Sequence, residues 1–169
     1  TAAKSNVYIA VLDTSNPTAN PVTVTTGATI SKETATLENT TFTEIDLQHQ
    51  NNNSFSDTIE NAIKKLSSPS DITCIYAGNN SFKNLDGIFS FNNLQELYLN
   101  DNKLTDLSAV SDCNKLKTLV LSYNKIRDLS SLSSLTALEY LDISSNKNIK
   151  DISVLYQLTR LKTLNISNT

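Results

Sequence analysis

Apolar and polar positions follow a fixed pattern along the C-terminal part of the chain, which reads Leu-x-x-Leu-x-Leu-x-x-Asn from Leu94 to Asn102. Copies of this pattern start at equal intervals, at Ile72, Leu94, Leu116 and Leu138. A fifth copy starts at Leu161, one residue later than this interval requires. The extra residue follows Asn146, where an insertion lengthens a loop and leaves the strand register intact. A constant period of this kind indicates a solenoid, in which each coil buries its apolar face only by stacking on its neighbours.

Each copy predicts one short strand. Leu97 and Leu99 are separated by one residue, which is the spacing of a strand, whereas an amphipathic helix would place apolar residues three or four positions apart. The inward positions of the predicted strands form two apolar columns. The first contains Leu97, Leu119, Leu141 and Leu164, and the second contains Leu99, Leu121, Ile143 and Ile166. Because full burial of one such side chain stabilises by roughly 1.5–3 kcal/mol, these columns should dominate the stability of the fold.

The segment after each strand predicts a turn and a short return to the next coil. Two further apolar columns close the turn: one contains Leu104, Ile126 and Ile149, and the other contains Leu107, Leu129 and Ile152. Two more line the return: one contains Val110, Leu132 and Leu155, and the other contains Phe91, Cys113, Leu135 and Leu158. Because Cys113 falls in an apolar column, we interpret it as a small buried hydrophobic residue. Returns of only a handful of residues favour 3₁₀ turns over full α-helices. Residue types that cap helices recur where the return starts, at Asp86, Ser108, Ser130 and Ser153.

A column of asparagines follows the strands, at Asn80, Asn102, Asn124 and Asn146. A buried turn at this place leaves backbone donors and acceptors without partners in the sheet. An asparagine amide supplies two donors and one acceptor oxygen, so stacked side chains can satisfy several coils at once. We therefore interpret this column as a structural asparagine ladder.

Residues 42–71 predict an irregular first coil. The stretch "FTEIDLQHQ" fits the strand template with Phe42, Ile45 and Leu47 inward, but the interval from Phe42 to Ile72 is longer than the regular period. A helix is expected at about residues 57–67, because Asp57 and Glu60 resemble a capping box and Pro69 would end the segment. The apolar stripe of this helix would comprise Phe55, Ile59, Ala62, Ile63 and Leu66.

Residues 1–41 do not fit the repeat, which occupies residues 72–169. The stretches at 7–12 and 22–26 both predict strands, and "DTSNPTANP" between them is typical of turns. They form either an N-terminal β-rich cap or the end of a preceding domain. The last repeat is incomplete and stops at Thr169, where an asparagine of the ladder would stand, so we expect the native chain to continue.

Side chains that alternate with the inward residues should face the other side of the sheet. Neighbouring coils stack about 4.8 Å apart, so Tyr76 and Tyr98 should be adjacent, with Val120 next. Exposed tyrosines beside acidic residues are typical of interface hot spots, since tyrosine combines a large apolar area with a polar tip. The candidate partner-binding residues are Tyr76, Glu96, Tyr98, Asn100, Val120, Tyr140 and Asp142.

Composition and charge narrow the function classes. The net charge of -3 argues against a nucleic-acid-binding protein, which normally has a clustered basic face. No apolar run is long enough to cross a bilayer, so we expect no transmembrane segment. His49 is the single histidine and lies in a polar stretch, without a marked nucleophile, a zinc-type spacing or a glycine-rich phosphate loop. We therefore expect no enzyme activity, no cofactor and no metal site.

The stretches "NKLTDLSAV", "NKIRDLSSLSSLTALEYLDISSN" and "IKDISVLYQLTRLKTLNISNT" closely resemble the 22-residue bacterial leucine-rich repeats of internalin-like surface proteins. This resemblance covers residues 72–169 well and residues 42–70 loosely. It implies an α/β solenoid, a right-handed arc whose short parallel strands line a concave face that grips protein partners.

Three functions stay open on this basis. The first is a secreted or surface-anchored bacterial protein that binds a protein partner, such as a host or cell-surface protein. The second is an intracellular regulatory scaffold, similar to the leucine-rich-repeat regulators of a protein phosphatase. The third is a self-assembling repeat array. The repeat specifies the scaffold and leaves the partner open, because one fold carries many specificities.

Overall fold

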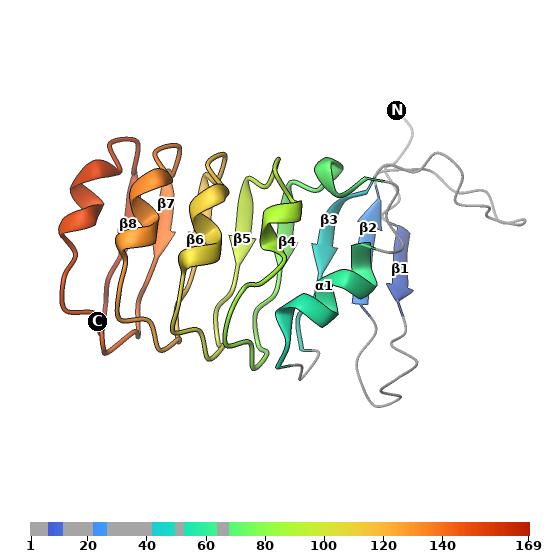
Figure 1. Cartoon of the computed structure of the whole chain (residues 1–169), viewed down its shortest axis with the longest axis horizontal. Coiled ribbons are helices and arrows are strands. Elements are labelled where there is room, and N and C mark those ends of the chain that lie inside the picture. The colour runs from blue at the N-terminus through green and yellow to red at the C-terminus, as the bar shows by residue number, and fades with distance from the viewer. Residues whose placement is uncertain (1–6, 12–21, 27–41, 50–52, 64–67) are drawn as a thin grey trace, which may run out of the picture.

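The computed structural model describes residues 7–11, 22–26, 42–49, 53–63 and 68–169. Eight strands form one sheet in sequence order (Figure 1). Six of them, β3 to β8, pair in parallel, each with the next along the chain. The strands are β1 (Val7–Val11), β2 (Val22–Thr26), β3 (Phe42–Asp46), β4 (Cys74–Tyr76), β5 (Glu96–Tyr98), β6 (Thr118–Val120), β7 (Tyr140–Asp142) and β8 (Thr163–Asn165).

The returns between strands contain short 3₁₀ helices, as the length of the segments predicted. They are η1 (Pro69–Asp71), η2 (Ile88–Ser90), η3 (Ser108–Asp112), η4 (Ser130–Ser134) and η5 (Ser153–Gln157). All the returns lie on one side of the sheet, so the described chain is an open solenoid with a strand face and a return face (Figure 1). We call these the concave face and the convex face.

The inward columns form the core of the solenoid. Leu97, Leu119 and Leu141 are fully buried and pair in register across β5, β6 and β7. In the last coil, Leu164 and Ile166 are 41% and 39% exposed, because no further coil of this sequence covers them. The predicted inward positions are therefore confirmed on β5, β6 and β7, where their burial follows from stacking between coils.

The cysteine in the return columns behaves as the pattern predicted. Cys113 is 4% exposed and belongs to the apolar core. Burial raises the pKa of its thiol to about 11, so the thiol stays neutral at ordinary pH. The interpretation of Cys113 as a small buried hydrophobic residue is confirmed.

The predicted caps of the returns are wrong. Ser108, Ser130 and Ser153 are the first residues of η3, η4 and η5, and their backbone N–H groups donate to carboxylates two positions earlier. The accepting residues are Asp106, Asp128 and Asp151, at 2.7, 2.8 and 2.8 Å respectively. An aspartate that bonds its own backbone two residues on forms a local turn, which starts the tight 3₁₀ helix earlier than an N-cap serine would.

The prediction that Asp86 caps a return is also wrong. The helix η2 starts at Ile88 and is preceded by Gly87, which has a φ of 95° and gives no side-chain cap. Glycine occupies this left-handed conformation without the steric cost that a Cβ would add.

The helix of the first coil starts two residues earlier than predicted. Helix α1 (Phe55–Ile63) follows Ser54, whose hydroxyl accepts the N–H of Asp57 at 3.2 Å. The cap is therefore a serine at the position that the sequence analysis left outside the helix. Phe55 and Ile59 of the predicted stripe are buried, and the ring of Phe55 meets Phe82 of the next coil edge-on at 5.3 Å. The predicted C-terminal part of this helix, 64–67, lies outside the described residues.

The strands expected in residues 1–41 are present at Val7–Val11 and Val22–Thr26. Strand β1 pairs antiparallel with β2, and β2 pairs antiparallel with β3, with an irregularity between Thr25 and Thr26. These two strands extend the sheet past its first parallel strand. Their role as a cap or as the end of a preceding domain stays a prediction.

Candidate partner-binding surface

The asparagine column ties each coil to the one before it. The amide nitrogen of Asn124 donates to the carbonyl of Leu121 in its own coil at 3.0 Å and to that of Leu99 in the preceding coil at 2.9 Å. Its amide oxygen accepts the N–H of Leu104 at 3.0 Å. The same bonds recur at Asn102 and Asn146, and Asn80 donates to the carbonyl of Leu47 at 2.7 Å. These side chains satisfy backbone groups that the turn would otherwise leave unpaired.

A left-handed residue precedes every asparagine of the ladder. Asn79, Asp101, Tyr123 and Ser145 have φ values of 57°, 54°, 57° and 58°, and His49 occupies the same place in the first coil. This left-handed position was not predicted from the sequence. The available signal was the absence of Val, Ile and Thr there in a threonine-rich chain, since β-branched residues tolerate positive φ poorly.

The centre of the concave face is a stacked tyrosine pair. The rings of Tyr76 on β4 and Tyr98 on β5 lie 4.9 Å apart with an interplanar angle of 16°. The hydroxyl of Tyr98 donates to the carboxylate of Glu96 at 2.8 Å. Val120 follows Tyr98 in the sheet register. Tyr76, Glu96, Tyr98 and Val120 are therefore neighbours on three consecutive strands.

The phenols of Tyr76 and Tyr98 stay protonated and uncharged at ordinary pH. A hydrogen bond to Cys74, together with burial, raises the pKa of the Tyr76 phenol. Burial and the hydrogen bond to Glu96 raise the pKa of the Tyr98 phenol. Burial likewise raises the pKa of the Cys74 thiol to about 12, so this cysteine stays protonated and unreactive at ordinary pH. The pair offers a neutral aromatic surface rather than a nucleophile.

The Asn100 side chain lies over Gly78 beside this pair. A Cβ at Gly78 would lie 2.6 Å from the Asn100 amide oxygen, so only glycine leaves room for this side chain in its present place. The amide nitrogen of Asn100 donates to the Asp101 carboxylate at 3.2 Å. Asn100 thus presents an oriented amide at the end of β5.

The last two candidate residues lie further along the sheet. Tyr140 and Asp142 are on β7, two strands from Tyr98, and Tyr140 is 36% exposed. The Asp142 carboxylate accepts the N–H of Ser144 at 2.9 Å, so it also has a structural bond that the sequence analysis did not foresee. Asp46 accepts the N–H of Gln48 in the same way on β3. The candidates therefore form a continuous set on β4 to β7, in which Asp142 is the register neighbour of Val120.

The concave face is acidic over a wider area than the sequence indicated, which placed acidic residues beside the tyrosines. Its outward positions on β3 to β8 carry four carboxylates and no Lys or Arg. The carboxylates belong to Glu44, Asp46, Glu96 and Asp142. This segregation was readable in the columns, but only after the outward positions were compared across all six coils for charge as well as for aromatic residues.

No other site type emerges in the described part of the chain. Its residues contain no group of three His, Cys, Asp or Glu side chains that could hold a metal ion. Among the same residues, no helix is long and apolar enough to cross a bilayer. His49 is exposed at the turn after β3.

Comparison with known proteins agrees with this geometry. A family model for two copies of the leucine-rich repeat matches residues 114–157, and a model for a single leucine-rich repeat matches residues 93–114. No curated protein sequence matches the chain. These matches and the solenoid geometry support a protein-interaction module of the leucine-rich-repeat type.

Two solved structures from Listeria monocytogenes are similar to the chain. Internalin C2 is 26% identical with a TM-score of 0.65, over 74% of this chain and 51% of that protein. The internalin inlF is 19% identical with a TM-score of 0.53, over 75% of this chain and 48% of that protein, and it supports the fold alone. The chain spans about half the length of these two proteins.

Proposed function

We propose that this chain, which is an internalin-like leucine-rich-repeat protein, is a non-catalytic module that binds a protein partner on its concave face. The observation that carries the proposal is the stacked pair of Tyr76 and Tyr98, with the Tyr98 hydroxyl bonded to Glu96. Stacked tyrosines offer a large apolar area with few rotatable bonds, and such residues carry much of the energy at protein interfaces.

The scaffold beneath this pair favours binding. The asparagine ladder and the inward leucines hold β4, β5 and β6 in register, so the outward side chains start from fixed backbone positions. A surface ordered before binding loses less conformational entropy when the partner arrives. Binding energy then comes from the few outward residues rather than from folding of the chain.

The partner of this face presents lysine or arginine side chains. Four carboxylates without a Lys or Arg on the outward positions of β3 to β8 favour a positively charged ligand. An arginine guanidinium can stack on the neutral ring of Tyr98 while it pairs with Glu96, which combines a cation–π contact with a charged hydrogen bond. A basic loop or segment of a folded protein would meet both requirements.

The proposed location is the bacterial cell surface or the medium, following the resemblance to internalin-like surface proteins. The alternative is an intracellular regulatory scaffold. The full-length gene distinguishes the two: a signal peptide with a wall-anchoring tail supports the surface protein, and a gene with neither supports the scaffold.

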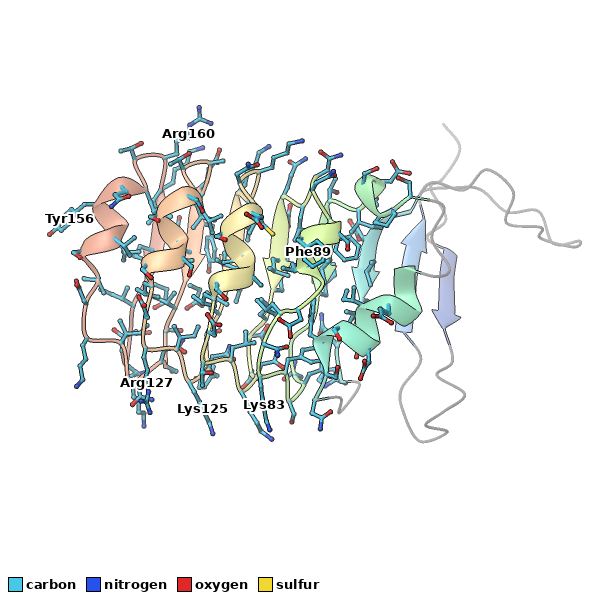
Figure 2. All side chains as sticks on the ribbon, viewed as in Figure 1. Lys83, Phe89, Lys125, Arg127, Tyr156 and Arg160 are labelled. Atoms are coloured by element: carbon cyan, nitrogen blue, oxygen red, sulfur yellow. The ribbon has the colours of Figure 1, made fainter. Side chains whose placement is uncertain are left out.

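Selection from a displayed library of extracellular protein domains tests the binding proposal. Domains that bind the wild-type chain are titrated against Tyr98→Ala and against Tyr156→Ala. Tyr156 is a matched control, because it is 89% exposed on η5 of the convex face (Figure 2). We expect Tyr98→Ala to weaken binding roughly thirtyfold and Tyr156→Ala to leave it unchanged. Equal affinities for the wild type and Tyr98→Ala would refute the proposal.

A further inference from the structure

A second charged surface lies away from the concave face, along the turns that follow the strands. Six exposed cations occupy these turns, and we call this surface the turn edge. Its members are Lys83, Lys103, Lys125, Arg127, Lys147 and Lys150. Figure 2 shows Lys83, Lys125 and Arg127 projecting from the same edge of the solenoid, and Arg160 from the opposite edge.

The repeat arranges these cations in rows. Lys103, Lys125 and Lys147 each directly follow an asparagine of the ladder in consecutive coils. Coils stack about 4.8 Å apart, so this row presents a positive charge at each step along the solenoid. Such a row fits a linear polymer with repeated negative charges better than it fits a single small ion.

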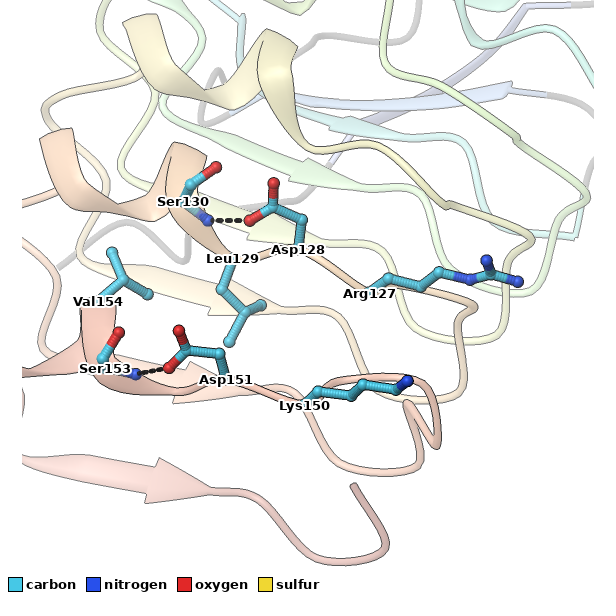
Figure 3. Close-up of a pocket in the computed structure, with 8 residues that line it drawn as sticks. All are labelled: Arg127, Asp128, Leu129, Ser130, Lys150, Asp151, Ser153 and Val154. Atoms are coloured by element: carbon cyan, nitrogen blue, oxygen red, sulfur yellow. Dashed lines mark hydrogen bonds between the residues drawn. The ribbon is translucent and has the colours of Figure 1, made fainter.

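The aspartates that directly follow Arg127 and Lys150 in the sequence are directed away from these two cations. In Figure 3 the Asp128 and Asp151 side chains turn toward the N–H groups of Ser130 and Ser153, while Arg127 and Lys150 extend side by side in another direction. Within the described part of the chain, the one ion pair joins Lys162 and Glu139, at 2.7 Å and outside the turn edge. The cations of the turn edge are therefore available to an external anion.

A cavity separates the turns of the coils that contain β6 and β7 (Figure 3). It has a volume of about 180 Å³ and is lined by Arg127 and Lys150, and also by Asp128 and Asp151, whose carboxylates accept the N–H groups of Ser130 and Ser153. A neighbouring cavity is lined by the same two cations and by Asn148. Asn148 stands at the single insertion in the otherwise regular repeat, so the departure from the period adds an amide group beside two cations.

We propose that the turn edge binds a linear sulfated polysaccharide, with one sulfate group held between Arg127, Asn148 and Lys150. The guanidinium donates two parallel hydrogen bonds to the oxyanion, and the lysine adds a point charge. Lys103, Lys125 and Lys147 follow the remaining charges of the polymer. A single-stranded nucleic acid fits less well, because it stacks successive bases on several aromatic rings. Tyr123 is the exposed aromatic side chain within these turns in the described chain.

Fluorescent dextran sulfate of defined length is the probe for this surface. The test variant is Arg127→Gln/Lys150→Gln. The control is Lys117→Gln/Arg160→Gln, which makes the same change in net charge near Glu139 on the other edge. We expect the test variant to lose affinity roughly tenfold or more and to show a weaker dependence of affinity on salt. The control should lose less than about twofold at physiological salt, since exposed charges beyond a Debye length are screened.

Three further measurements sharpen the test. Deletion of Asn148 should weaken dextran sulfate binding, and millimolar inorganic sulfate should compete with the probe. Oligo-dT of equal charge should bind more weakly than dextran sulfate. Equal losses in the test and control variants, tighter binding of oligo-dT, or no binding of dextran sulfate to the wild type would each overturn the proposal. Unchanged melting temperatures establish that both variants fold.

This proposal is independent of the concave face. Tyr98→Ala should leave dextran sulfate binding unchanged, because Tyr98 lies on β5 among the outward residues of the sheet. A loss of dextran sulfate binding in Tyr98→Ala would contradict the assignment to the turn edge.

Discussion

The inward and outward positions of the same strands follow different rules. On β5, β6 and β7 the inward residues are all leucine at Leu97, Leu119 and Leu141, and each is fully buried. The outward residues at the matching central position are Tyr98, Val120 and Asp142, which share neither size nor charge. Stacking requires every coil to present the same inward shape, whereas nothing in the stack constrains the outward side chains in this way.

Fold and function depend on different sets of positions in this molecule. Properties that repeat every coil, such as the leucine columns and the asparagine ladder, belong to the scaffold. Properties that change from coil to coil, such as the Tyr76–Tyr98 pair and the insertion at Asn148, are the candidates for recognition. Mutations at the two kinds of position should therefore have opposite effects on stability and on binding.

The largest expected effect on stability comes from an inward leucine. Leu119→Ala should lower the free energy of unfolding by about 2–5 kcal/mol, because it removes a fully buried side chain and leaves a cavity between two coils. Urea denaturation of the variant and the wild type measures this difference. A loss below about 0.5 kcal/mol would mean that the column is not the core of the solenoid.

The asparagine ladder should contribute less than a leucine but still measurably. Asn124→Ala leaves the N–H of Leu104 and the carbonyl of Leu99 without the bonds that Asn124 makes to them. We expect a cost of about 1–3 kcal/mol, with the exposed Asn114→Ala outside the ladder as the matched control. An unchanged midpoint of thermal unfolding for Asn124→Ala would contradict the ladder.

The aspartate turns predict a dependence on acid. The hydrogen bond from the Ser153 backbone lowers the pKa of the Asp151 carboxyl. A lowered folded-state pKa gives a contribution that is present above the unfolded value, about 3.9, and is lost as the pH falls through the folded value. Between neutral pH and about pH 3, the wild type should therefore lose more melting temperature than Asp151→Asn. Identical pH profiles for the two proteins would show that this carboxylate does not stabilise the return.

The outward tyrosine should have the smallest effect on stability. Tyr98→Ala removes the stacking with Tyr76, a contact worth about 0.5–1.5 kcal/mol, and leaves the inward side chains in place. The melting temperatures of Tyr98→Ala and Leu119→Ala, measured by circular dichroism, compare the two faces of the sheet directly. A Tyr98→Ala loss as large as that of Leu119→Ala would remove the distinction between scaffold and recognition surface.

The spacing of leucines was enough to predict the strands, their parallel order and the inward residues. A constant period determines which side chains lie above one another, and burial follows from that stacking. The same period predicted that Tyr76 and Tyr98 are neighbours. The choice of partner-binding residues stays a prediction, because the repeat constrains only the scaffold.

The local capping chemistry was not predictable in the same way. Ser108 and Asp106 are both residues that bond backbone N–H groups, and only the geometry shows that the aspartate accepts the bond while the serine supplies the N–H. For α1, Ser54 and Asp57 were both suitable start signals, and the structure selects Ser54. The cations of the turn edge were not predicted, and acidic residues were expected only beside the tyrosines, because the leucine period constrains the scaffold positions and not the charge of the residues between them.

The main proposal is that a protein partner binds the concave face. Protection of an introduced thiol from alkylation is its most direct test. Val120→Cys places a reactive thiol on the concave face, while Cys74 and Cys113 are buried and have raised pKa values that slow their alkylation. The rate of iodoacetamide labelling is measured with and without a selected partner domain, with Tyr156→Cys as the control on the convex face. We expect the partner to slow labelling of Val120→Cys and not of Tyr156→Cys. Slower labelling of Tyr156→Cys with an unchanged rate for Val120→Cys would contradict the proposal.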